Sequence, residues 1–198
     1  IPEAVGAYQD LTINVDGSEG CKFNGDVLII DMGSYTTDIA VIGPGGQIRK
    51  EYVHTLEDCG FLNLYDRFRK AAQESGIKYG RIPNERIETA LKTGKMKLIN
   101  GEIDVKEVID KVVETSITPI VDRIKVLLAE DIQFLDAIIG VGGGAEFIKE
   151  FFGELGSAIT IPEEPQFANS RGYLKTLTYA SGLTIIDDLE EVEELAEA

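Results

Sequence analysis

Residues 26–38 read Asp-Val-Leu-Ile-Ile-Asp-Met-Gly-Ser-Tyr-Thr-Thr-Asp, and this stretch decides the fold. The apolar run Val27 to Ile30 predicts a buried strand. It ends at Asp31 and a glycine, Gly33, and the chain then continues through two threonines into a second apolar run. The pattern predicts a hairpin whose tip can bind a phosphate group.

Each position of this hairpin offers a group suited to an anion. The Gly33-Ser34 tip lets backbone amides approach a phosphate closely, and the hydroxyls of Thr36 and Thr37 add donors. Asp31 can hold a metal-bound water without touching the phosphate. An ordinary hairpin with Asp and Gly as turn residues is the alternative. The full Asp-x-Gly-x-x-Thr-Thr-Asp pattern between apolar strands favours phosphate, although no Gly-Lys-Ser/Thr tripeptide of a Walker loop occurs.

Composition sets the class of protein. The chain has 198 residues, of which 43% are hydrophobic and 27% charged, enough for one substantial core. We expect one domain over residues 1–186, with a small helical and hairpin subdomain near 77–130. Residues 187–198 form an acidic tail, interpreted either as a solvated, partly helical segment or as a docking peptide.

The same composition limits location and partners. The sequence has no run of some 18 apolar residues and its first residues do not resemble a signal peptide, so we expect a cytoplasmic protein without a membrane segment. A net charge of −16 argues against direct binding to nucleic acid. Cys21 and Cys59 suggest neither a disulfide framework nor a zinc site, and His54 has no ligand-type neighbour at metal spacing.

The remaining sequence predicts a mixed order of helices and strands. Strands 27–30, 37–42 and 47–56 form an antiparallel meander. A strand at 136–141 reaches the turn Gly142-Gly143-Gly144. Helices are expected at 3–10, 60–75, 85–93 with Asn84 as its cap, 105–129 with an interruption at Pro119, 145–155 and 168–183; a two-strand excursion at 95–104 turns at Asn100-Gly101.

The triple glycine is a second chemical signal. A strand, Gly142 to Gly144 and then a helix would place bare backbone amides at a helix amino terminus, where phosphate or ribose oxygens are favoured. A tight strand-to-helix turn without a ligand is the alternative. The stretch also approaches a dinucleotide fingerprint, but no second βαβ half follows it.

Taken in order, these parts resemble one half of the actin-like ATPase superfamily, with its ribonuclease H-like α/β domain, and in particular the plasmid-segregating ParM/StbA type. The stretch 30–38 resembles the second phosphate motif of that superfamily, and 140–145 resembles its adenosine motif. Residues 2–7 resemble its first interdomain connector, and 168–174 its Ala-Asn-x-x-Gly segment.

The resemblance implies ATP or ADP with Mg²⁺ as cofactors. Asp31 would manage Mg²⁺ through water, and Glu3 would orient the attacking water. The β- and γ-phosphates would bind Gly33, Ser34, Thr36 and Thr37, and the nucleoside and α-phosphate would bind Gly142, Gly143 and Gly144. Glu88 and Lys92 loosely resemble the residues that flank adenine and ribose; an exposed i,i+4 ion pair between them is the alternative.

The superfamily begins with another domain that carries its own phosphate loop, and this chain shows none. We therefore expect the second, C-terminal half only, inactive alone and dependent on an N-terminal actin-like domain. The intact protein would be a filament-forming ATPase for plasmid or DNA segregation, engaging a DNA-bound adaptor. A sugar kinase or chaperone-like ATPase, and a catalytically silent interaction module, are the alternatives.

Overall fold

A mixed five-stranded sheet forms the centre of the molecule. The structure is a computed structural model, and it describes residues 3–77, 80–155 and 159–181. The strand order is β3-β2-β1-β6-β7. The strands are β1 (Asp26–Met32), β2 (Thr37–Gly43), β3 (Gln47–Leu56), β6 (Leu135–Val141) and β7 (Ile159–Thr160). Because β1, β2 and β3 pair antiparallel and β1, β6 and β7 pair parallel, the predicted α/β architecture with an antiparallel meander is confirmed.

Strand β1 is buried on both faces, which explains its continuous apolar run. Leu28 and Ile30 face the larger of two clusters of buried residues, whereas Val27 and Ile29 face the smaller one. In the register with β6, Asp31 lies opposite Val141. The parallel pairing therefore brings the end of β1 beside the glycine turn that follows β6.

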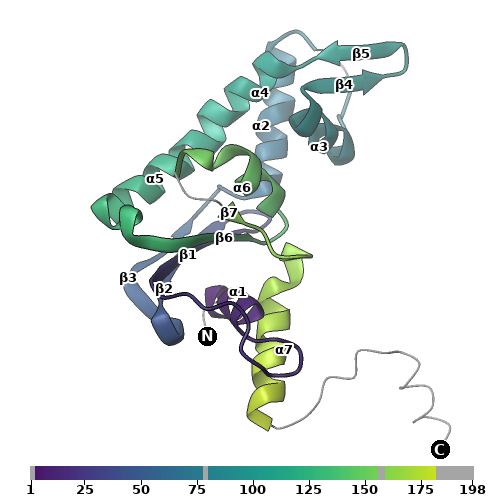
Figure 1. Cartoon of the computed structure of the whole chain (residues 1–198). Helices are drawn as coiled ribbons and strands as arrows, with labels where there is room; N and C mark the ends of the chain where they lie inside the picture. The colour runs from purple at the N-terminus through teal and green to yellow at the C-terminus, as the bar shows by residue number, and fades with distance from the viewer. Residues whose placement is uncertain (1–2, 78–79, 156–158, 182–198) are drawn as a thin grey trace, which may run out of the picture.

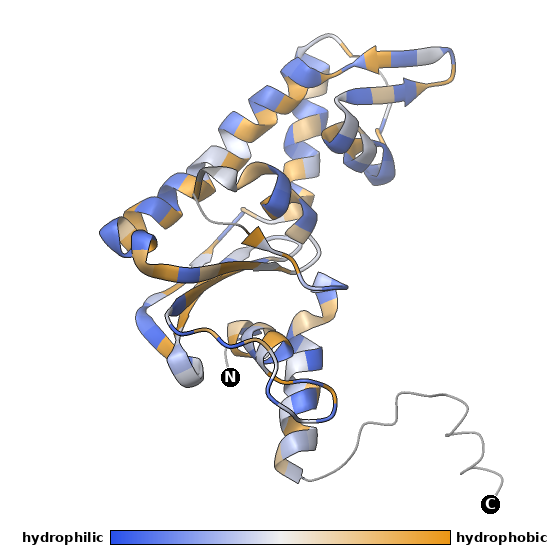
Figure 2. Ribbon diagram, viewed as in Figure 1, coloured by the Kyte–Doolittle hydropathy of each residue, from blue (hydrophilic) through white to orange (hydrophobic). Residues whose placement is uncertain are grey.

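Helices cover both faces of the sheet (Figure 1). On one face lie α1 (Glu3–Thr12) and α7 (Ala168–Ser181), and residues of both belong to the smaller cluster. On the other face lie α2 (Phe61–Glu74), α5 (Thr118–Leu128) and α6 (Ala145–Phe151). Figure 2 shows the apolar colours concentrated on the strands and on the sides of the helices that face them.

A smaller group of elements projects from one end of the molecule (Figure 1). It contains α3 (Asn84–Thr93), the hairpin of β4 (Lys95–Leu98) and β5 (Gly101–Asp104), and α4 (Lys106–Val112). Leu98 pairs with Gly101, so the hairpin turns at Ile99-Asn100 and not at the predicted Asn100-Gly101. None of the described helices is long and apolar enough to cross a membrane.

The predicted interruption of the long helix at Pro119 has a defined geometry. Helix α4 passes into a π-helical turn, Val113–Ile117, and α5 begins immediately before Pro119. A proline ring clashes with the carbonyl four residues earlier, and its missing N–H costs nothing in the first turn of a helix. The wider turn relieves this clash and lets the chain continue in nearly the same direction.

Other predicted boundaries differ in detail. Helix α1 runs to Thr12, α6 stops at Phe151 and is followed by a short turn at Gly153–Leu155, and β7 was not predicted. The capping role of Asn84 was wrong, because Asn84 is the first residue of α3 and its side-chain oxygen accepts a hydrogen bond from the Arg69 guanidinium instead. Residues 1–2, the end of the helix predicted at 168–183 and the acidic tail lie outside the described residues.

Candidate functional site

The carboxylate of Asp31 lies at the centre of the predicted phosphate site. Asp31 ends the buried strand β1 and is only 7% exposed. The side-chain amide of Asn169, in the first turn of α7, donates a 2.7 Å hydrogen bond to it. Burial raises the pKa of Asp31 above its ordinary value, the bond from Asn169 lowers it in part, and the charges of Glu3 and Asp38 raise it further. Segments 138 residues apart in sequence therefore meet at one carboxylate.

The hairpin tip is held in place by the start of α2. Gly33 N–H donates to the carbonyl of Thr36 at 3.0 Å and closes the tip. The amides of Phe61 and Leu62 donate to the carbonyls of Gly33 and Ser34, each at 3.0 Å. The first amides of a helix have no partner inside the helix, so the tip satisfies them. This arrangement fixes the hairpin against α2 and leaves Ser34 exposed.

Gly60 makes this close approach possible, and sequence reasoning did not identify it. Its amide donates to the carbonyl of Tyr35 at 3.0 Å, and a Cβ atom at Gly60 would overlap the backbone of Ser34 and Tyr35. A glycine at the first position of the helix predicted over 60–75 is the only signal that the sequence offers for such a contact.

The two threonines differ in what their hydroxyls can do. Thr37 is fully buried, and its hydroxyl donates to the carbonyl of Cys59 at 2.7 Å. Thr36 is half-buried, and among the described residues its hydroxyl has one long contact of 3.5 Å, with Asp38. The Thr36 hydroxyl is thus the freer donor, whereas the Thr37 hydroxyl ties the hairpin to the connection before α2.

The glycine turn packs directly on the end of β1. Gly142 adopts a φ of +84°, and a Cβ atom there would overlap the carboxylate of Asp31. The amide of Gly142 donates to the Pro165 carbonyl at 3.0 Å, and that of Gly144 donates to the Met32 carbonyl at 2.9 Å. The expectation of bare amides was therefore wrong for these two glycines, since the parallel sheet brings acceptors close to both. Among the described residues, no carbonyl accepts from the amide of Gly143.

Glu88 and Lys92 both lie on α3, but they do not pair with each other. The hydroxyl of Tyr65 donates to Glu88 at 2.6 Å, and Lys92 lies 3.7 Å from Glu146 in the first turn of α6. The i,i+4 ion pair offered as an alternative was therefore wrong, because each side chain has a partner on another helix. Burial raises the pKa of the Tyr65 hydroxyl, and its bond to Glu88 raises it further.

Glu3 lies close enough to the site to influence it electrostatically. It is exposed in the first turn of α1, and its charge adds to the effect of burial in raising the pKa of Asp31 and of Tyr173. Helix α1 is fixed to α7 by Asp10, whose buried carboxylate accepts from the Arg171 guanidinium at 2.7 Å and from the Lys175 ammonium at 2.8 Å. The same helix pair therefore positions Glu3 and Asn169 around Asp31.

The oxygen atoms of Asp31 and Asn169 suit a divalent cation that keeps most of its water ligands. They do not form a site in which protein side chains supply all the ligands. In the part of the chain that the structure describes, no three His, Cys, Asp or Glu side chains are arranged to hold a metal ion. Asn169 Oδ1 is buried next to Asp31 and has no partner among the described protein groups. One carboxylate and one free amide oxygen fit Mg²⁺, which keeps several waters and takes few protein ligands.

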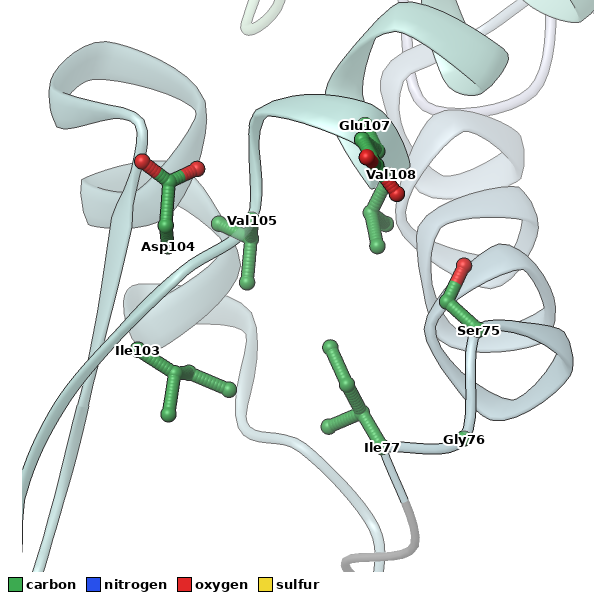
Figure 3. Close-up of a pocket in the computed structure, with 8 residues that line it drawn as sticks. All are labelled: Ser75, Gly76, Ile77, Ile103, Asp104, Val105, Glu107 and Val108. Atoms are coloured by element: carbon green, nitrogen blue, oxygen red, sulfur yellow. The ribbon is translucent and has the colours of Figure 1, made fainter.

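A cavity elsewhere in the molecule does not coincide with this chemistry. It has a volume of about 660 Å³ and lies between the end of α2 and the start of α4 (Figure 3). Ile77, Ile103 and Val108 line it together with the carboxylates of Asp104 and Glu107. None of the predicted site residues lines it, so this cavity is separate from the cluster around Asp31.

Comparison with known proteins gives consistent matches. The family model described as "Archaeal actin homologue MreB-like, C-terminal" matches residues 29–154. An archaeal actin homologue of Thermoplasma volcanium is 30% identical over an alignment of 156 residues, and the match covers 74% of this chain and 45% of that protein. A homologue of Thermoplasma acidophilum matches with the same identity and coverage. The chain spans about half the length of these curated relatives.

Solved structures share the fold. The crystal structure of an archaeal actin homologue superposes with a TM-score of 0.67 at 26% identity, over 89% of this chain and 55% of that one. A complex of that homologue with ADP gives the same TM-score and identity, over 89% of this chain and 56% of that one. A ParM filament from Clostridium botulinum gives a TM-score of 0.64 at 23% identity, over 86% of this chain and 50% of that one; at this identity the likeness concerns the fold alone.

Proposed function

The chain belongs to the family of MreB-like archaeal actin homologues, and on that premise we propose that it forms the C-terminal, nucleotide-binding half of an ATPase. One observation carries the proposal: the carboxylate of Asp31 lies between the phosphate hairpin and Gly142 and is held there by Asn169. The ADP complex of the archaeal homologue supports a nucleotide as the ligand.

The proposed roles follow from the groups at the site. Asp31 and the free oxygen of Asn169 would hold the water shell of Mg²⁺, which, when bound, would neutralise charge on the β- and γ-phosphates. The exposed Ser34 and the Thr36 hydroxyl would donate to those phosphates. The exposed carboxylate of Glu3 would orient the attacking water.

A second group of residues would receive the nucleoside. The amide of Gly143 is available to a ligand, and the close packing of Gly142 and Gly144 on β1 brings the turn beside Asp31. Of Glu88 and Lys92, Lys92 lies 3.7 Å from Glu146 at the start of α6, next to this turn, and Glu88 accepts from Tyr65. We assign them the ribose and adenine side of the site, with Tyr65 and Glu146 as the partners that orient them.

The proposed activity requires a second half. Because the matched relatives are about twice as long, we propose that an N-terminal actin-like domain closes the site and excludes water from the reaction. Alone, this half forfeits contacts to the other side of the triphosphate and should bind nucleotide weakly. Loss of the γ-phosphate would then change the balance between open and closed domain arrangements.

Self-association into filaments is the assembly that we propose. Ile99, at the tip of the β4–β5 hairpin, is 97% exposed, and Phe134, which follows α5, is 76% exposed. Figure 1 shows this hairpin at the upper right of the molecule and the end of α5 at its left side, so the two lie on different parts of the surface. Two unlike apolar sites on different parts of one surface permit head-to-tail contacts that repeat without closing. Plasmid or DNA segregation through a DNA-bound adaptor, as in ParM/StbA proteins, is the finer part of the proposal and agrees with an acidic chain.

The test is calorimetric titration of ATP-Mg²⁺ into this chain, alone and with the N-terminal half of the protein. We expect weak binding that tightens with the added half and disappears in Asp31→Ala. A matched control is Asp136→Ala, which removes a carboxylate at the opposite end of the sheet. Absence of binding in every combination would contradict the nucleotide site and favour a silent interaction module.

Turnover and assembly need a second measurement on the two halves combined. Phosphate release with a Glu3→Gln variant tests hydrolysis, which should fall while nucleotide binding persists. Sedimentation with and without ATP tests assembly, and Ile99→Asp should reduce the pelleted fraction without changing nucleotide binding. Unchanged pelleting of the Ile99→Asp protein would exclude the hairpin tip from the contact.

A further inference from the structure

A small cavity lies behind the phosphate hairpin, where α2 meets the π-helical turn between α4 and α5. Its volume is about 10 Å³, and its lining includes Met32 at the end of β1, Gly60 and Asn63 at the start of α2, and Ser116 in the π turn. None of the residues proposed to contact nucleotide lines it. The cavity is therefore distinct from the nucleotide site, although it shares the α2 amino terminus with it.

Two buried polar atoms of residues in this lining have no hydrogen-bond partner among the residues that the structure describes. They are the side-chain oxygen Oδ1 of Asn63 and the hydroxyl oxygen of Ser116. Ser116 is only 4% exposed, so bulk solvent cannot satisfy its hydroxyl. A buried polar group without a hydrogen bond is costly, and native interiors rarely leave two of them beside one cavity. The pair indicates a ligand that bonds to both.

Size and chemistry select the ligand. A cavity of about 10–15 Å³ measured in this way holds one water molecule. A hard divalent cation would need about six oxygen ligands, and the lining offers two that lack a partner. The guanidinium of Arg67, which also lines the cavity, would further repel a cation. An apolar ligand would leave both oxygens unsatisfied.

We propose that this cavity binds a single water molecule that joins the start of α2 to the π turn. The hydroxyl of Ser116 donates to the water, and the water donates to Oδ1 of Asn63. Arg67 makes a parallel connection, because its guanidinium donates to the carbonyl of Thr115 at 2.8 Å and to that of Asp58 at 3.3 Å. The water and Arg67 together fix the π turn against the segment that supports the hairpin.

The proposed water supports the position of the phosphate hairpin through the start of α2. The first turn of α2 carries both Asn63, which lines the cavity, and the amides of Phe61 and Leu62, which donate to the hairpin carbonyls. The connection before it carries the Cys59 carbonyl that accepts from Thr37. Asn63 and Ser116 are thus positioning residues for the hairpin, and this role does not depend on whether a nucleotide binds there.

The first test is a high-resolution crystal structure of the wild-type chain. We expect an ordered water within hydrogen-bonding distance of Asn63 Oδ1 and Ser116 Oγ. A direct hydrogen bond between the two side chains, with no water between them, would overturn the proposal. This test needs no substitution and no nucleotide, so its result is independent of the proposed function.

The second test is amide hydrogen exchange in Ser116→Ala, Asn63→Leu and the double variant. Either single change leaves the water with one protein partner, and the amides of Phe61 and Leu62 should then exchange roughly tenfold faster. The second change should add little to the first, because both act through one water. Ser75→Ala, an exposed serine at the other end of α2, is the matched control and should change nothing. Unchanged exchange at Phe61 and Leu62, or fully additive effects, would contradict the proposal.

Discussion

Gly172 of α7 crosses Gly6 of α1 so closely that a Cβ atom on Gly172 would overlap the carbonyl oxygen of Gly6. The reciprocal position is equally crowded, since a Cβ atom on Gly6 would overlap the carbonyl of Asn169. Two glycines thus let the backbones of α1 and α7 touch. The crossing places Asn169 where its amide reaches Asp31.

Gly172→Ala should therefore weaken both the fold and the site. The added methyl group must push α7 away from α1, and overpacking of this kind costs about 1–3 kcal/mol. We expect a lower midpoint of urea unfolding and weaker nucleotide binding, because Asn169 moves with α7. Gly153→Ala is the control, since a Cβ atom there meets nothing within 4 Å and the backbone is not left-handed. Equal stability of the two variants would show that the helices can separate without cost.

The buried carboxylate of Asp10 should matter more than any exposed ion pair. Asp10→Ala leaves the charges of Arg171 and Lys175 without their carboxylate partner between α1 and α7. Removing one partner of a fully buried pair costs roughly 3 kcal/mol. We expect a smaller loss here, because the partly exposed Arg171 can be solvated by water when its partner is removed. Glu19→Ala removes the fully exposed pair with Lys22, which water and salt screen, and should leave the unfolding midpoint nearly unchanged. Denaturant unfolding of both variants gives the comparison, and similar losses would contradict it.

Asp31 should make the chain without nucleotide less stable as the pH rises. Its pKa is raised by burial, so the folded state binds a proton more tightly than the unfolded state. The contribution of Asp31 to the free energy of unfolding is then most favourable below the unfolded pKa of about 3.9. It becomes less favourable as the pH rises from there through the folded pKa. Asp31→Asn cannot titrate and should lose this dependence while also losing Mg²⁺-dependent nucleotide binding. Unfolding curves at several pH values check the sign; a wild-type stability that rises through this window relative to Asp31→Asn would refute it.

The strands and turns of this fold can be predicted from local sequence, whereas the contacts between distant segments cannot. The apolar run at 27–30 and the turn glycines predict the meander, because strand periodicity and turn chemistry are local properties. The parallel pairing of β1 with β6 sets Asp31 against Gly142, and that partnership depends on segments more than a hundred residues apart. Local pattern cannot reveal such a pairing, and the resemblance to a known family supplied the expectation instead.

The errors have the same origin. The amides of Gly142 and Gly144 were expected to be bare because the sequence does not show that carbonyls of Pro165 and Met32 come within reach. Glu88 and Lys92 have i,i+4 spacing, yet Tyr65 and Glu146 from other helices offer each of them a partner. The sequence indicates Asn169 only as part of a segment that resembles one in the superfamily. Its hydrogen bond to Asp31 depends on the crossing of α1 and α7, which local sequence pattern does not predict.

Thr36 and Thr37 offer a test that separates binding from support. The hydroxyl of Thr37 is buried and bonded to Cys59, so Thr37→Val should cost about 1–2 kcal/mol of folding stability by leaving that carbonyl without its donor. The Thr36 hydroxyl has only a long contact, so Thr36→Val should leave stability within about 0.5 kcal/mol and weaken nucleotide binding instead. Thr37→Ser keeps the hydroxyl and should keep most of the stability.

Thermal unfolding and nucleotide titration of the three variants measure both effects. A Thr36→Val protein that binds nucleotide normally would remove Thr36 from the phosphate site, whereas a stable Thr37→Val protein that fails to bind would assign the contact to Thr37.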